Sequence, residues 1–172
     1  MPKLRMSQNA LQRFSQWLPA SPIGAAVFSK FLHIVDKPIM RLSNEKISVP
    51  QLVAGLPCVR LTSVGAKSGV SRTIPTIGIP DDENIALICS NWGQSHNPGW
   101  YYNLRKHPAA ELAFIGEDGE THTGQYTAEE MTQDGEYERL WQKACDVYIG
   151  YPKYRLRAAN RRIPIMLMKP SG

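Results

Sequence analysis

The chain has 172 residues, of which 42% are hydrophobic and 20% are charged, a balance typical of a single globular domain that folds in water. This composition excludes a disordered chain, and no run approaches the roughly 18 uncharged apolar residues that a membrane-spanning helix needs. The three cysteines are odd in number and widely spaced, which excludes a disulfide framework or a zinc motif and favours a reducing, cytoplasmic location.

The net charge of +5 is unevenly distributed along the chain. Residues 1–50 carry seven Lys or Arg against two Asp or Glu, whereas residues 51–172 carry thirteen of each kind. A nucleic-acid-binding domain normally spreads its cations over one face of the folded body. The charge pattern therefore argues against nucleic acid as a partner.

Residues 1–50 are predicted to form an amphipathic helical leader, separate from a domain over residues 51–172. Pro19 and Pro22 divide it into two short helices, and we expect it to be retained rather than cleaved as a signal peptide. Its apolar positions recur every three or four residues and include Leu11, Phe14, Trp17, Leu18, Ile23, Val27, Phe31, Leu32 and Val35. This apolar face packs on the domain or on a second subunit; the alternative is binding to the membrane surface on the inner face of the cell membrane.

After residue 50 the sequence turns into short β-rich runs separated by turns. These runs are "PCVRLTS", "RTIPTIGIP", "NIALICS", "AAELAFI" and "ETHTGQYTA". A helix is predicted over "AEEMTQDGEYERLWQKACDVY", with Leu140, Trp141, Ala144 and Val147 on one face, and "RRIPIMLMKP" closes the chain as a strand. Five or six strands with inserted helices predict an α+β, mainly β, closed or partly closed barrel.

The stretch "LTSVGAKSGVSRTIP" places cations beside glycines in a turn between two strands. It is not a Walker A loop, because Ala66 stands where that motif requires glycine before the lysine. The turn can still bind an anion through its backbone N–H groups together with Lys67, Ser68 and Arg72. The alternative is an ordinary hairpin whose cations are solvated.

The stretch "SNWGQSHNPGWYYNLRKHP" is rich in aromatic residues. Asn97 and Pro98 predict a helix start with Asn97 as N-cap, and Trp100, Tyr101 and Leu104 are spaced to face inward. The preceding residues 90–97 form a polar segment whose backbone can approach a flat ligand while Trp92 or Trp100 covers its apolar surface. An aromatic helix that only packs on the barrel is the alternative.

Taken together, three stretches resemble the deazaflavin-dependent nitroreductase family. They are "LTSVGAKSGVSRTIP", "SNWGQSHNPGWYYNLRKHP" and "YIGYPKYRLRAANRRIPIMLMKP", which occur in the family's order over residues 59–170. The resemblance implies a split β-barrel with peripheral helices and an oxidoreductase that uses coenzyme F420. It further implies hydride transfer from the reduced coenzyme to an electron-poor acceptor such as a quinone, a nitroaromatic or an activated enone.

The resemblance also implies roles for individual residues. Lys67, Ser68, Gly69 and Arg72 would hold the phosphate and acidic tail of the coenzyme, and the remaining cofactor-binding residues would be Pro75, Ser90, Asn91, Trp92 and Trp100. Tyr148, Tyr151 and Tyr154 would lie on the substrate side, although a tyrosine-rich helix that covers the barrel mouth explains them equally well. Water or a nearby hydroxyl such as Ser90 or Tyr154 would supply the proton after hydride transfer. Ala66, where the family often has Arg, removes one cation from the tail site.

Other functional classes stay open at this point. The same barrel serves FMN-binding oxidoreductases, and a non-catalytic deazaflavin carrier would show the same coenzyme contacts. The four histidines are dispersed, so no metal site is predicted. The expected partners are a small-molecule acceptor and, if the chain is not monomeric, a second copy in a homodimer.

Overall fold

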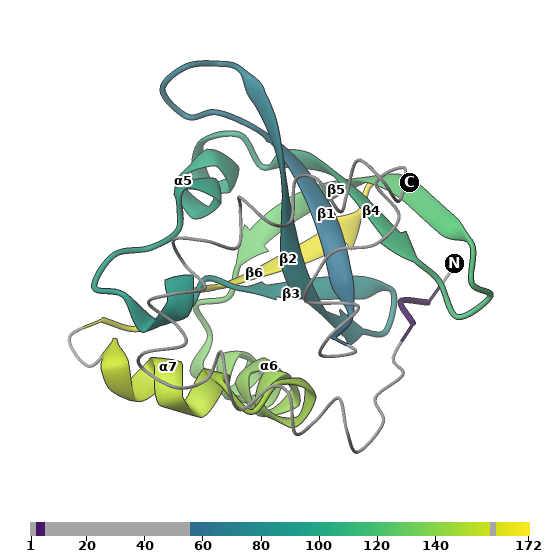
Figure 1. The fold of residues 1–172 in the computed structure, drawn as a ribbon. Helices are drawn as coiled ribbons and strands as arrows, with labels where there is room; N and C mark the ends of the chain where they lie inside the picture. Colours follow the sequence, from purple (N-terminus) through teal and green to yellow (C-terminus); the bar gives the residue numbers. More distant parts are fainter. Residues whose placement is uncertain (1–2, 6–55, 159–160) are drawn as a thin grey trace, which may run out of the picture.

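The computed structural model describes residues 3–5, 56–158 and 161–172, and six antiparallel strands form a closed barrel at its centre (Figure 1). Around the barrel the strands are ordered β1-β2-β3-β6-β5-β4. Their bounds are β1 Cys58–Val64, β2 Ser71–Asp81, β3 Asn84–Ile88, β4 Ala109–Ile115, β5 Thr121–Glu130 and β6 Ile165–Pro170. The predicted mainly β barrel with peripheral helices is therefore confirmed.

Strands β3 and β6 are buried on both faces, which explains their continuous apolar sequences. Ile85 and Leu87 point into the barrel, where they pack with Met166 and Met168 of the neighbouring strand β6. The alternate residues of the same strands, Ala86, Ile88, Ile165 and Leu167, face outward and join a second apolar cluster beneath the helices. Strand β5 lacks this helical cover, and its outward residues are exposed and polar.

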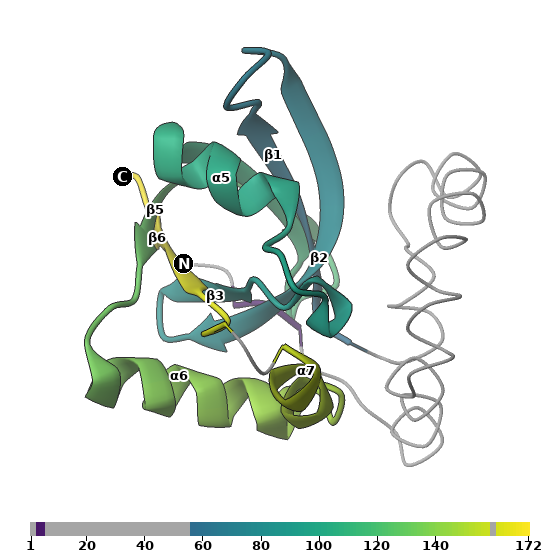
Figure 2. The ribbon, with the colours of Figure 1, turned by 90° about the vertical axis from the view of Figure 1, so that its left-hand side faces the viewer.

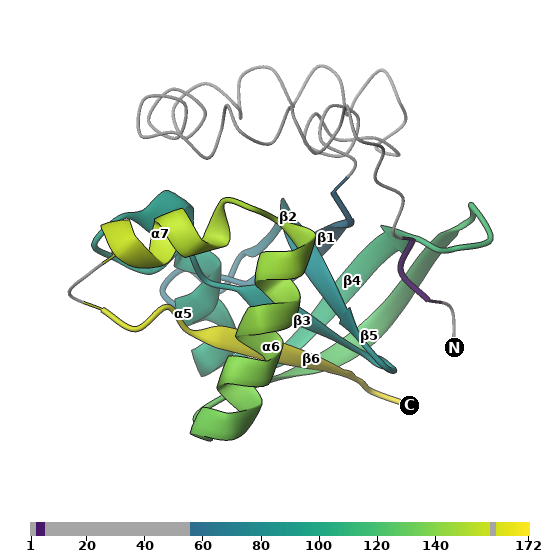
Figure 3. The ribbon, with the colours of Figure 1, turned by 90° about the horizontal axis from the view of Figure 1, so that it is seen from below.

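Two helices cover the outer face of β3 and β6, and a third packs on the opposite side (Figures 1 and 3). Helix α6, Asp134–Val147, buries the face that the apolar spacing predicts, and α7, Tyr151–Arg157, follows it closely. Helix α5, Gly99–Lys106, contacts β1 and β5, so the barrel lies between α5 and the other two helices (Figure 2). The α5 side carries the turn of the first motif stretch that suggests coenzyme binding and the helical part of the second.

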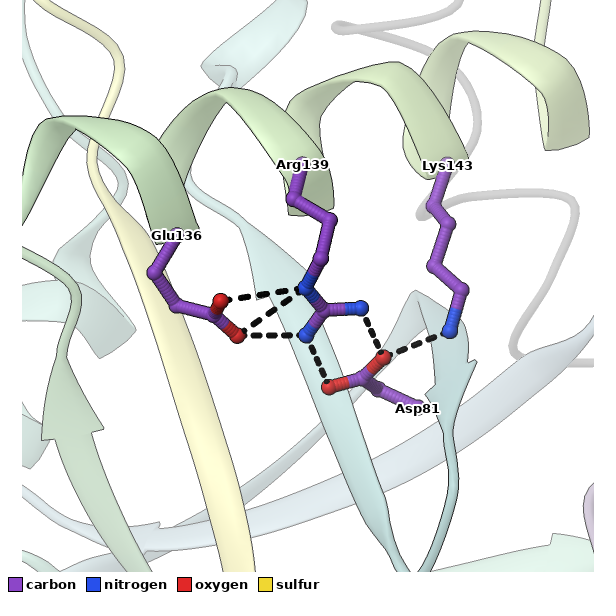
Figure 4. Close-up of polar contacts among 4 residues, drawn as sticks. All are labelled: Asp81, Glu136, Arg139 and Lys143. Atoms are coloured by element: carbon purple, nitrogen blue, oxygen red, sulfur yellow. Dashed lines mark hydrogen bonds and ion pairs between the residues drawn. The ribbon is translucent and has the colours of Figure 1, made fainter.

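A charged network joins α6 to the end of β2 (Figure 4). The Asp81 carboxylate accepts hydrogen bonds from both terminal nitrogens of Arg139, each at 2.7 Å, and from Lys143 Nζ at 2.5 Å. Arg139 also pairs with Glu136 on its own helix. The Arg139 hydrogen bonds lower the pKa of Asp81, although its burial acts in the opposite direction. This network fixes the helix on the barrel.

Two local predictions are wrong. The helix predicted to begin near Ala128 begins at Asp134, because Ala128–Glu130 continue β5 and pair with β6 residues Met168 to Met166. The helix-forming glutamates are overridden by this backbone ladder. Asn97 does not cap α5: Pro98 occupies the N-cap position, and the Asn97 side-chain oxygen accepts a hydrogen bond from Arg161 instead.

Only residues 3–5 of the predicted leader lie in the described part of the chain. Leu4 is buried in the barrel interior and forms an antiparallel bridge with Gly116. Arg5 N–H donates to Ile115 O at 3.1 Å, which adds a second contact with the β4–β5 end of the barrel. The predicted leader helices lie outside the described residues, and none of the described helices is long and apolar enough to cross a membrane.

Candidate functional site

The β1–β2 turn, Gly65–Val70, is exposed at its tip and closed by backbone hydrogen bonds. Gly65 N–H donates to Val70 O at 2.9 Å and Gly69 N–H donates to Gly65 O at 2.8 Å. Gly69 has φ +67°, a left-handed conformation that glycine adopts without the strain of a side chain. In the part of the chain that the structure describes, the exposed side chains of Lys67 and Arg72 make no hydrogen bond or ion pair. Both cations are therefore available to an anionic ligand.

Helix α5 holds this turn in place through two side chains. Asn103 Oδ1 accepts the Ala66 N–H at 2.9 Å, and its Nδ2 donates to Ser63 Oγ at 3.3 Å. Lys106 Nζ donates to Ala66 O at 2.6 Å. Both backbone polar groups of Ala66 are thus bound by α5, which brings the two sequence stretches together. The position of the turn is set by the helix rather than by the hairpin alone.

The 90–97 loop, residues 90–97 between β3 and α5, begins with an unusual backbone. Asn91, Trp92 and Gly93 have φ values of 46°, 58° and 77°, so three consecutive residues are left-handed. For the two residues with side chains, such a conformation costs on the order of 1–3 kcal/mol each and requires support from the surroundings. Strain of this kind is a frequent mark of ligand-binding segments.

Several contacts supply this support. Gly93 N–H donates to Ser90 O at 2.9 Å, and Asn91 Nδ2 donates to His96 O at 3.0 Å. A Cβ on Gly93 would lie 3.0 Å from Tyr154 O, so only glycine permits the close approach of α7. Arg157 donates to Trp92 O at 3.3 Å, and Arg161 donates to four acceptors of the loop and its flanks.

The three tyrosines predicted on the substrate side are all buried. Tyr148 and Tyr154 join their hydroxyl oxygens at 2.8 Å, and Tyr151 packs edge-on against both rings. Burial raises the pKa of Tyr154, so its hydroxyl stays protonated. The Tyr154 ring also meets Trp92 edge-on, with centroids 6.2 Å apart. The tyrosines therefore lie directly behind the 90–97 loop.

The predicted proton donors differ in their surroundings. Ser90 is half-buried, and within the described ranges its hydroxyl makes no hydrogen bond, although its backbone N–H and C=O are both engaged. The Tyr154 hydroxyl is already bound to Tyr148. Among the other predicted cofactor residues, Pro75, Asn91, Trp92 and Trp100 are half-buried, so each combines a fixed position with exposed surface.

The β1–β2 turn and Trp100 lie on the α5 side of the barrel, whereas Trp92 and the three tyrosines pack in the apolar cluster beneath α6 and α7. The β1–β2 turn is bound by α5, α5 follows the 90–97 loop, and that loop rests on α7 and its tyrosines. A separate cavity of about 380 Å³ lies at the other end of β2, where Asp82, Asn84, Lys143 and Asp146 contribute to its lining. None of the predicted site residues lines that cavity. It does not belong to the candidate site.

Comparison with known proteins identifies the family of the chain. The F420H(2)-dependent quinone reductase family matches residues 37–170 of the chain. The chain belongs to this family. It is an F420-dependent oxidoreductase that catalyses hydride transfer, and coenzyme F420 is its cofactor.

Individual relatives agree with this family. The F420H(2)-dependent quinone reductase Rv1261c of Mycobacterium tuberculosis is 28% identical over 113 residues, which cover 65% of this chain and 72% of that protein. A solved F420-H2 dependent reductase, FDR-A, is 28% identical with a TM-score of 0.56 and covers 66% of this chain and 94% of its own. A second structure, described as a domain-swapped dimer, is 26% identical with a TM-score of 0.59, covering 80% and 98%.

The described residues fit the coenzyme of this quinone reductase family. Lys67 and Arg72, which form no ion pair with any residue the structure describes, suit a phosphate and an acidic tail. The 90–97 loop offers a hydrogen-bonded backbone that includes half-buried Trp92, which suits a flat ring system. The coenzyme supplies the hydride when bound, so the protein needs no nucleophile of its own.

Two residues with clear structural roles escape the sequence prediction. Asn103 binds the turn from 37 residues away, and Arg161 binds the 90–97 loop from 64 to 71 residues away. The motif letters "NLRKHP" and "RRIP" contain both residues. Their partners could not be predicted, because those partners come together only in the closed barrel.

Proposed function

We propose that the chain transfers a hydride from reduced coenzyme F420 to a quinone-type acceptor, at a site formed by the β1–β2 turn, the 90–97 loop and α5. The observation that carries the site assignment is the link between motifs: α5 binds both backbone groups of Ala66 through Asn103 and Lys106. This link holds the cations of the turn in a fixed relation to the aromatic helix and the loop before it.

Within this site, Lys67, Ser68, Gly69 and Arg72 bind the phosphate and acidic tail of the coenzyme. Pro75, Ser90, Asn91, Trp92 and Trp100 border its ring, and the rings of Tyr148, Tyr151 and Tyr154 support the acceptor side. Rigid contacts of this kind orient the reacting atoms and exclude water, which is the main contribution a protein makes to hydride transfer.

Reduction of a quinone requires a proton as well as a hydride, giving a hydroquinone. Ser90 Oγ donates a hydrogen bond to the acceptor carbonyl, and the proton passes through this hydroxyl from solvent. The absence of another hydrogen bond to this hydroxyl in the described part of the chain supports the assignment. Tyr154 is the second candidate, but proton loss would leave a buried phenolate, which its raised pKa disfavours.

Titration of the full chain with coenzyme F420 and with FMN tests the coenzyme assignment. We expect Lys67→Ala and Arg72→Ala each to weaken F420 binding about ten- to a hundredfold, because each removes a charge-assisted contact of roughly 1.5–3 kcal/mol. Lys169→Ala is the matched control, since this lysine pairs with Glu129 on β5 and is absent from the site. Unchanged F420 affinity in both site variants would contradict the assignment.

Turnover separates an enzyme with a quinone acceptor from a coenzyme carrier. Oxidation of reduced F420 should be rapid with a quinone such as menadione and slower with a nitroaromatic or an activated enone. Binding of F420 without turnover of any acceptor would favour the carrier.

Two further hypotheses remain predictions: homodimer formation, suggested by the relative described as a domain-swapped dimer, and membrane-surface binding by residues 1–50. Analytical ultracentrifugation and sedimentation with anionic vesicles test them.

A further inference from the structure

Within the described residues, the side-chain hydrogen bonds of Arg161 all go to the 90–97 loop and the residue before it. Its Nε donates to Gln94 O at 2.9 Å, and its two terminal nitrogens donate to Asn97 Oδ1 at 2.6 Å and Ser90 O at 2.8 Å. Cys89 O lies 3.5 Å from both terminal nitrogens. One planar group therefore binds the loop at its start, middle and end.

These acceptors are all neutral. In the described ranges, residues 3–5, 56–158 and 161–172, Arg161 forms no ion pair with a carboxylate. Burial lowers the pKa of Arg161, which reflects the cost of removing its charge from water without a compensating anion. A carboxylate partner would have compensated the charge of Arg161. The guanidinium instead donates its N–H groups to neutral acceptors in and next to one loop.

That loop contains the three consecutive left-handed residues Asn91 to Gly93. Ser90 O, one of the Arg161 acceptors, also accepts the Gly93 N–H at 2.9 Å and so closes the strained turn. We propose that Arg161 is a positioning residue, which holds the 90–97 loop in the conformation that borders the coenzyme ring. This inference rests on the proposed function, because it takes the loop as one wall of the F420 site.

Lysine cannot replace this arginine. The guanidinium is a planar fork that binds four separate acceptors at once, whereas an ammonium is a single point on a flexible stem. The adjacent Arg162 provides a matched control, because it is exposed, pairs with Asp134 at 2.9 Å and stacks over the Tyr137 ring. None of these contacts reaches the loop.

The first measurement is hydrogen–deuterium exchange on the full chain without coenzyme. In Arg161→Lys and Arg161→Gln, we expect the amides of Gly93 and Gln94 to exchange at least about tenfold faster, while amides in β3 and β6 keep their protection. Arg162→Gln should leave both regions unchanged. Unaltered exchange in the loop, or equal acceleration throughout the barrel, would overturn the proposal.

The second measurement is coenzyme affinity and turnover in the same variants. We expect Arg161→Lys to weaken F420 binding and to lower kcat with menadione, each about tenfold, because a mobile loop no longer fixes the ring. Millimolar guanidinium added to Arg161→Gly should restore both loop protection and F420 affinity, an effect that a general loss of stability does not produce.

The outcomes separate this proposal from the proposed function. Faster loop exchange with wild-type F420 affinity and kcat would overturn the positioning role, while lost binding in Lys67→Ala would still support the coenzyme site. If the wild-type chain fails to bind F420, the proposed function and this positioning role both fail, although the exchange data would still show whether Arg161 orders the loop.

Discussion

Arg139 and Arg161 each join segments that are distant in sequence, but they bind groups of opposite character. Arg139 lies on α6 and binds the carboxylates of Asp81 and Glu136 (Figure 4). Arg161 precedes β6 and binds backbone carbonyls and one amide oxygen around the 90–97 loop. On the α6 side, the charge of Arg139 is paired with carboxylates. On the loop side, Arg161 binds neutral acceptors.

We interpret the Asp81 network as a contribution to stability and the Arg161 contacts as a contribution to function. At the α6 side, a nearly fully buried carboxylate meets two cations that are each about 42–43% exposed, an arrangement that stabilises the docking of the helix. At the loop side, the left-handed backbone of Asn91 and Trp92 costs free energy, and Arg161 has no carboxylate partner among the described residues. We therefore expect substitutions on the first side to change the free energy of unfolding with little effect on coenzyme affinity, and substitutions on the second side to change both.

The largest effect is expected for Asp81→Asn. This change removes the charge shared by Arg139 and Lys143 while the side chain stays buried, and it should lower the free energy of unfolding by about 2–3 kcal/mol. F420 affinity should stay within about twofold, because the network lies at the opposite end of β2 from the turn. Urea unfolding and calorimetric titration measure the two quantities. Asp134→Asn is the control, since that carboxylate is 89% exposed.

The same variant carries a pH test. The pKa of Asp81 is lower in the folded chain than in the unfolded chain, so its contribution is present above the unfolded pKa of about 3.9 and is lost as pH falls through the folded value. The stability gap between wild type and Asp81→Asn should therefore be full at neutral pH and narrow below about pH 4. A gap that stays constant down to low pH would show that the charge is not what stabilises the helix.

Gly93→Ala tests the loop side. The new Cβ would meet Tyr154 O at 3.0 Å at a φ of +77°, so we expect a loss of about 2 kcal/mol in unfolding free energy and weaker F420 binding. Gly135→Ala is a matched control, because its Cβ would contact nothing within 4 Å and alanine favours the helix. A Gly93→Ala chain as stable as wild type would mean that the loop does not need its left-handed backbone.

Asn103→Ala tests the link between α5 and the β1–β2 turn. It removes the hydrogen bonds to Ala66 N and Ser63 Oγ, which should cost about 1–1.5 kcal/mol of stability and about three- to tenfold in F420 affinity. Asn103→Asp keeps an acceptor for the Ala66 N–H and should retain more of the stability. If Asn103→Ala binds F420 as wild type does, the turn does not depend on α5 for its position.

The sequence predicts the barrel better than it predicts these contacts. Alternation and turn residues locate the strands, and three- to four-residue spacing identifies the buried face of α6, because both patterns are local. The glutamates at the end of β5 mislead, since pairing with β6 outweighs their helix preference. Asn97 misleads likewise, because Arg161 binds the side-chain oxygen that would cap α5. In each case a partner distant in sequence decides the outcome.

The candidate site is likewise predicted only where its signals are local in the sequence. The cations of the β1–β2 turn and the aromatic residues of α5 are visible as motifs, and the structure places them on one side of the barrel. For Tyr148, Tyr151 and Tyr154, the sequence leaves substrate contact and packing as equal alternatives. In the structure all three side chains are buried. Gly150 explains part of this burial, because a Cβ there would lie 2.4 Å from the Tyr148 ring.

Tyr154→Phe is expected to have the smallest effect and lies where the two sides meet, since its ring packs in the cluster beneath α6 and also touches Trp92. Losing the hydroxyl breaks the 2.8 Å bond to Tyr148 and should cost about 1 kcal/mol of stability, while the ring keeps its packing. F420 affinity should stay within about twofold, and kcat with a quinone should fall several-fold, because the hydroxyl pair lies behind the loop on the proposed acceptor side.

Urea unfolding, titration and steady-state kinetics on one preparation give the three values, with Tyr126→Phe as a control for loss of a tyrosine hydroxyl on β5, away from the loop. An equal fall in F420 affinity and kcat would place Tyr154 in the coenzyme site, whereas an unchanged kcat would make it a packing residue and leave Ser90 as the remaining proton donor.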